Sequence, residues 1–140
     1  MGFYTSVVYP AMLGVFGATA LLGLVTLVWT RAHGVLKWSV TAVWILTAVQ
    51  LVVVAVLLVG DVDAPLLTTI GYLLVSVALL PLFGIGRLGE PEAAATDPDP
   101  NRPVLAPDQV ARVDAVAALI LAVSLVVVSW RLEQILVTAA

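Results

Sequence analysis

The chain of 140 residues contains no cysteine and a single histidine, His33. The missing thiols exclude disulfides, thiolate metal sites and iron–sulfur clusters. One imidazole cannot supply both axial ligands of a haem, and it cannot form a dedicated zinc site without further ligands. We therefore expect neither a cofactor nor a bound metal ion.

Charged residues are also scarce, because they make up 11% of the chain whereas 62% of its residues are hydrophobic. A soluble domain uses about 25% charged residues to cover its surface. This composition, with a mean hydropathy of +1.15, indicates that the surrounding solvent is lipid. The net charge of −3 argues against a nucleic-acid partner. Arginine in excess of lysine, with abundant Ala, Val and Leu, indicates a GC-rich bacterial genome.

Four apolar runs are long enough to cross a bilayer, which takes about 20 helical residues. Helices are expected because an unpaired backbone group in lipid is costly and four spans are too few to close a barrel. The first run lacks a basic N-terminal region and exceeds the apolar length of a signal peptide, so we expect it to remain as a span. The sequence predicts an all-α integral membrane protein, one membrane domain with transmembrane helices at 7–29, 38–60, 64–86 and 110–130.

The connections between these spans differ greatly in length. Two short connections predict that the first three helices form an antiparallel row. The third connection, about 87–109, is acidic and contains Pro91, Pro98, Pro100, Pro103 and Pro107, a composition typical of a flexible linker. Such a linker is long enough to let the fourth helix pack either in its own bundle or against a partner.

Lysine and arginine are distributed asymmetrically about the spans. The first and third connections and their borders hold Arg31, Lys37, Arg87, Arg102 and Arg112, whereas the other side holds only Arg131. Basic residues mark the cytoplasmic side, so we predict a bacterial plasma-membrane protein with both termini extracytoplasmic. Aromatic residues are expected at the interfaces, namely Tyr4, Tyr9, Trp29, Trp38 and Trp130.

No Asp, Glu, Lys, Arg or His lies near the middle of a predicted span. An ion-coupled transporter normally needs such a group to bind its ion. The sequence also has no nucleophile with a base and an acid, and no glycine-rich phosphate loop in a suitable context. We therefore expect that the protein is not an enzyme. Near the fourth span, Asp108 and Arg112 have the spacing of a helical ion pair, and Asp114 lies near the positive end of the helix dipole.

Two groups of polar residues are candidate contact sites. Thr47, Gln50, Thr69 and Tyr72 lie inside spans, and they either form a hydrogen-bonded seam between helices or contact a polar ligand. Arg31, His33 and Lys37 lie in the first connection, where they either bind anionic lipid headgroups or only set the topology.

Small residues form two stripes at helical spacing. One comprises Ala11, Gly14 and Ala18 in the first span, and the other comprises Ala111, Ala115, Ala118 and Ala122 at the fourth. Small residues let helix backbones approach closely in lipid, where no hydrophobic drive exists. Either stripe can pack inside the bundle or dock on another membrane protein. For the first span packing inside the bundle is favoured, and for the fourth the two are evenly balanced.

These features favour a non-catalytic accessory, assembly or stabilising subunit of a larger plasma-membrane complex. Its expected partners are other integral membrane proteins and lipids, with a homo-oligomer also possible, and the small-residue faces and the linker would make the contacts. The alternative function is a small oligomeric translocation protein for a lipid or lipid-linked substrate, in which Thr47, Gln50, Tyr72 and the basic first connection would line a path for headgroups.

Overall fold

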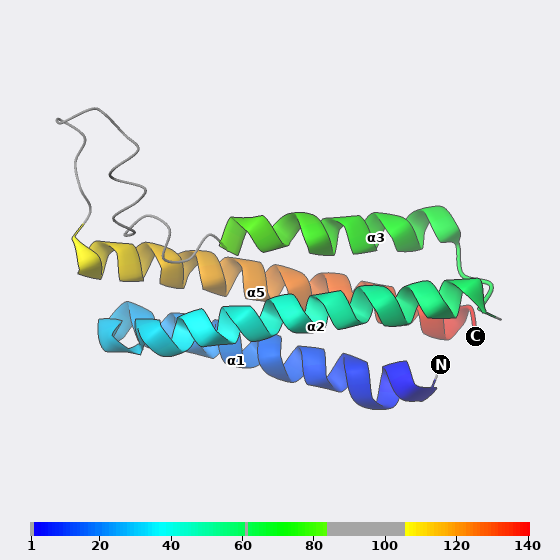
Figure 1. Cartoon of the computed structure of the whole chain (residues 1–140), viewed down its shortest axis with the longest axis horizontal. Helices are drawn as coiled ribbons and strands as arrows, with labels where there is room; N and C mark the ends of the chain where they lie inside the picture. The colour runs from blue at the N-terminus through cyan, green and yellow to red at the C-terminus, as the bar shows by residue number, and fades with distance from the viewer. Residues whose placement is uncertain (1, 61, 84–105) are drawn as a thin grey trace.

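The computed structural model describes residues 2–60, 62–83 and 106–140. Within these ranges the chain is all-α, with four helical segments that are long and apolar enough to cross a membrane. They run in the order η1 (Tyr4–Val8), α1 (Tyr9–Val28), η2 (Thr30–Ala32), α2 (His33–Val59), α3 (Leu66–Leu79), η3 (Leu80–Phe83) and α5 (Pro107–Thr138). Figure 1 shows them as a bundle of nearly parallel rods, with both termini at the same end.

The connection between the first two spans is shorter than the sequence suggests. α1 ends at Val28, Trp29 adopts an extended conformation, and the 3₁₀ turn of η2 leads directly into α2. Arg31 therefore lies in the turn, whereas His33 and Lys37 belong to the first turns of α2. This difference matters because a helical His33 is held in a fixed direction, whereas a loop residue would not be.

A proline shapes each of the two outer spans. In the third, the α-helical hydrogen bonding gives way to the 3₁₀ helix η3 at Leu80, next to Pro81. Proline cannot donate a backbone hydrogen bond and it disturbs the preceding turn, which explains the change from α-helical to 3₁₀ hydrogen bonding. In the first, Pro10 follows a π-helical turn in which the Tyr9 N–H donates to the Tyr4 carbonyl.

The longest helix, α5, lies at the centre of the bundle. Its most extensive contact is with α1, and α3 packs on α5 more than on α2. The first three spans therefore do not form a simple row, because α5 separates α3 from α1 (Figure 1). α5 also extends beyond the predicted span at both ends. Gln109 stabilises its first turn, since its side-chain oxygen accepts a hydrogen bond of 3.0 Å from the Ala106 N–H.

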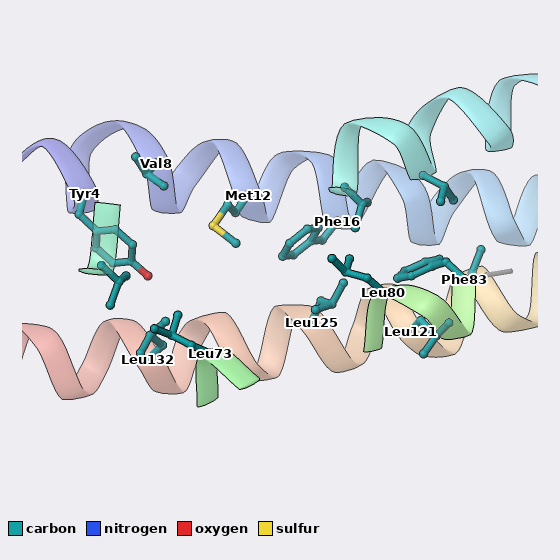
Figure 2. Close-up of a cluster of buried hydrophobic side chains, with 14 of the residues drawn as sticks. Tyr4, Val8, Met12, Phe16, Leu73, Leu80, Phe83, Leu121, Leu125 and Leu132 are labelled. Carbon is teal, nitrogen blue, oxygen red and sulfur yellow. The ribbon is translucent and has the colours of Figure 1, made fainter. Parts of the chain in front are cut away.

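One continuous hydrophobic core runs along the bundle. Figure 2 shows Tyr4, Met12 and Phe16 of the first span pointing toward leucines of α5, while Leu73, Leu80 and Phe83 come in from the third. The outer surface is just as apolar, with Val28, Trp38 and Leu67 each more than three quarters exposed. A helix bundle that is apolar on both its inner and outer faces is suited to a lipid environment.

Candidate docking faces and polar contacts

The alanine stripe of α5 lies inside the chain's own bundle. Ala115, Ala118 and Ala122 are fully buried, and Ala111 is 3% exposed. Because α5 makes its most extensive contact with α1, the stripe is the surface on which these two helices meet. The long connection before α5 therefore does not carry the stripe to another protein, and a partner cannot reach these alanines while the bundle is intact.

The close approach of α1 and α5 depends on Gly23. A Cβ atom at this position would lie 2.9 Å from the Ala115 carbonyl oxygen and 3.3 Å from the Leu119 backbone nitrogen. Both obstacles are backbone atoms, so a side chain here cannot be accommodated by a rotamer change. Nothing in the spacing of small residues distinguishes Gly23 from its neighbours, because the two stripes of the sequence do not include it.

The small-residue stripe of α1 has the opposite placement. Ala11, Gly14 and Ala18 are all exposed, and a Cβ added at Gly14 would have no neighbour within 4 Å. The expectation that this stripe packs inside the bundle is therefore wrong. The inward face of α1 instead uses Met12, Phe16 and Gly23.

Apolar residues extend this exposed stripe in both directions. We define the α1 outer seam as Val7, Ala11, Gly14, Ala18, Leu21, Val25 and Val28. Successive members are four and three residues apart, which is the spacing that keeps one helix face against a neighbouring helix. Val7, Leu21, Val25 and Val28 are between 45% and 90% exposed. The α1 outer seam is therefore a continuous apolar stripe with its three smallest side chains next to one another.

Gln50 is buried and bonded to the first span. It is 1% exposed, and its Nε2 donates a hydrogen bond of 3.3 Å to the Tyr4 hydroxyl oxygen. Tyr4 itself is fully buried, with its ring 6.5 Å from that of Tyr9. The expectation that Tyr4 belongs to an interfacial aromatic belt is therefore wrong, because the tyrosine supplies the buried polar partner that the amide needs.

The other polar residues of the predicted seam bond to their own helices. The Thr47 hydroxyl donates to the Val43 carbonyl at 2.8 Å, and the Thr69 hydroxyl donates to the Pro65 carbonyl at 3.0 Å. Tyr72 is half-buried on α3. Gln50 and the α3 residues are thus not joined by a hydrogen bond in the part of the chain that the structure describes. Hydroxyls that bond locally satisfy themselves and do not line a polar path.

A largely buried hydrogen bond links the first residue of α2 to α5. The His33 Nε2 and Asp114 Oδ2 atoms are 2.7 Å apart, and the two side chains are 20% and 4% exposed. Near them, the Thr30 hydroxyl donates to Asp108 Oδ1 at 3.4 Å. Asp108 and Arg112, both described, do not form the ion pair that their spacing suggests. Asp114 is not a helix cap, because α5 begins at Pro107 and the Asp114 side chain is buried between helices.

The contact between His33 and Asp114 should contribute to the stability of the bundle. We expect His33→Ala to lower the free energy of unfolding by about 1–3 kcal/mol, because the nearly buried Asp114 carboxylate loses a partner. Reversible unfolding in mixed detergent measures this change. In an Asp114→Asn background the same substitution should cost less than half as much. An equal cost in both backgrounds would show that His33 acts through packing alone.

Arg31 and Lys37 remain available on the outside of this end. Both side chains are exposed, so they can reach lipid headgroups, whereas His33 is engaged by Asp114. Among the described residues no three His, Asp or Glu side chains form a group that could hold a metal ion. Comparisons with models of protein families, with curated proteins and with solved structures find no match for this chain.

Proposed function

We propose that this protein is a non-catalytic accessory or stabilising subunit of a larger complex in a bacterial plasma membrane. Its four helices cross the bilayer, and the α1 outer seam packs against a transmembrane helix of another protein. The acidic, proline-rich connection, of which residues 84–105 lie outside the described ranges, gives a further segment for docking on the cytoplasmic side.

The placement of small residues on the outside of α1 is the observation that carries this proposal. Where α5 presents buried alanines to α1, two helices of this chain come into backbone contact at Gly23. The α1 outer seam also combines glycine and alanine at this spacing, but no helix among the described residues covers it. Because small residues permit such contacts in lipid, a second helix of similar shape fits there.

The outward face of α2 provides the contrast. It presents Trp38, Ile45 and Val52, all of them at least 60% exposed. Bulky side chains of this kind contact flexible lipid tails without needing a shaped partner. A row of Ala, Gly and Ala leaves a shallow depression in the surface, and a rigid helix gains more dispersion contacts there than lipid does.

Isolation of the protein from its native membranes in mild detergent tests the proposal. We expect mass spectrometry to find a different integral membrane protein in stoichiometric amount. A homogeneous oligomer of this chain alone, carrying bound lipid, would instead favour lipid translocation and would contradict the accessory role.

The orientation of the protein in the membrane is a separate prediction. Gly34 at the start of α2 and Thr138 at the end of α5 are both exposed. These two helix ends lie at opposite ends of the bundle (Figure 1), and the chain has no cysteine of its own. The asymmetry of basic residues predicts that an impermeant thiol reagent labels Thr138→Cys on intact cells but not Gly34→Cys. Labelling of Gly34→Cys alone would invert the orientation.

A further inference from the structure

A groove with a mixed polar and apolar lining lies between the start of the third span and the end of α5. It has a volume of about 470 Å³, which is within the usual range for ligand sites. Asp63 and Thr68 line it on one side, Arg131, Gln134 and Thr138 line it on the other, and Tyr72 lies deeper along α3. The start of the third span and the end of α5, which supply the lining residues, lie at the end of the bundle that holds both termini (Figure 1).

Two opposite charges share the groove without pairing. Asp63 and Arg131 both line it, yet no ion pair joins them, although both belong to the described part of the chain. The Arg131 guanidinium lies over the Trp130 ring, with Cζ 5.3 Å from the ring centroid, and its Nη1 atom donates a long hydrogen bond, 3.3 Å, to the Gln134 side-chain oxygen. Glu133, two residues after Arg131, points to nearly the opposite side of α5. A ligand with an anionic and a cationic group would bridge Asp63 and Arg131.

The height of the groove matches the headgroup level of a bilayer. The segment Leu66–Phe83 contains 18 residues, which at 1.5 Å per residue spans about 27 Å, close to the hydrocarbon thickness. Asp63 therefore lies just outside the hydrocarbon, and Arg131 follows the long apolar run of α5 and the interfacial Trp130. The exposed Leu66 and Leu74 on α3 give acyl chains an apolar surface to follow.

We propose that this groove binds the phosphoethanolamine headgroup of a phospholipid. The phosphate accepts hydrogen bonds from the Arg131 guanidinium and from the hydroxyl of Thr68 or Thr138. The primary ammonium group donates to the Asp63 carboxylate. Choline lipids carry a cation without N–H donors, and glycerol lipids carry no cation, so neither satisfies Asp63. This inference rests on the membrane placement proposed above, but it does not depend on a protein partner.

Competitive lipid binding to the purified, delipidated protein tests the proposal by native mass spectrometry. We expect a phosphatidylethanolamine to be retained over a phosphatidylcholine and a phosphatidylglycerol of the same acyl chains by roughly tenfold. Asp63→Asn should abolish the preference over the choline lipid, whereas Arg131→Gln should weaken binding of all three. Arg112→Gln, an exposed arginine at the other end of the bundle, is the matched control and should change nothing.

Two outcomes would overturn the proposal. One is equal retention of the three lipids, or a preference that survives both groove variants. The other is displacement of the lipid by an equal concentration of water-soluble glycerophosphoethanolamine, which would identify a soluble phosphoester as the ligand. Asp63 and Arg131 are exposed, so both variants should keep the wild-type melting temperature. If the wild-type protein shows no lipid preference but still co-purifies with a partner protein, the groove assignment is refuted and the proposed accessory role is not.

Discussion

Gly23→Leu should unfold or severely destabilise the bundle. The new side chain would have to displace backbone atoms of α5, since even a Cβ atom at Gly23 would be 2.9 Å from the Ala115 carbonyl oxygen. Overpacking usually costs roughly 1–3 kcal/mol, and we expect a loss at or above the top of this range because rigid backbone cannot yield. Thermal or detergent-induced unfolding of the purified variant measures the effect.

Ala118→Leu is a second test of the same contact. Ala118 is fully buried on α5, so a leucine there should also force α1 and α5 apart. Gly14→Leu is the matched control for Gly23→Leu, because it adds the same side chain to α1 at a position where a Cβ atom has no neighbour within 4 Å. We expect its unfolding free energy to stay within about 0.5 kcal/mol of wild type. Wild-type stability of Gly23→Leu would show that α1 and α5 do not pack as described.

The all-α architecture could be predicted from the sequence because it depends on composition and run length. Few charges and four long apolar runs leave helices as the main solution in lipid. Helix bounds were less predictable, since α5 continues past Arg131 to Thr138. A charged residue ends an apolar run, but it does not end a helix when its side chain can reach the headgroups.

The direction of each small-residue stripe could not be predicted from the sequence. Both stripes have the same periodicity, and periodicity shows which residues share a face but not what covers that face. What covers each stripe depends on where α5 packs, and the long connection before α5 does not fix that position. Once α5 lies against the face of α1 that contains Gly23, Gly14 and Ala18 must point outward.

The polar contacts show the same dependence on tertiary structure. Gln50 could be identified as a buried amide that needs a partner, but its partner Tyr4 is 46 residues away in the chain. His33 and Asp114 are 81 residues apart. From the sequence, His33 is expected to contact lipid and Asp114 to act at the helix end, because a single sequence shows only which residues are neighbours along the chain.

The second large effect should appear in assembly rather than in stability. Gly14→Leu places a bulky side chain at the middle of the α1 outer seam, where a partner helix would need close backbone approach. Gly14 is exposed, and a Cβ atom added there has no neighbour within 4 Å in this chain. We therefore expect the variant to fold normally and to lose most of its bound partner, with recovery reduced on the order of tenfold, which corresponds to a loss of about 1.4 kcal/mol.

Val52→Leu is a suitable control for general surface changes, because Val52 is 63% exposed on the outward face of α2. The decisive measurement is the amount of partner protein recovered per mole of this chain from native membranes, for wild type, Gly14→Leu and Val52→Leu. The proposed docking role predicts a selective loss with Gly14→Leu. Equal recovery with all three proteins, at equal melting temperature, would show that the α1 outer seam faces lipid and would contradict the proposed function.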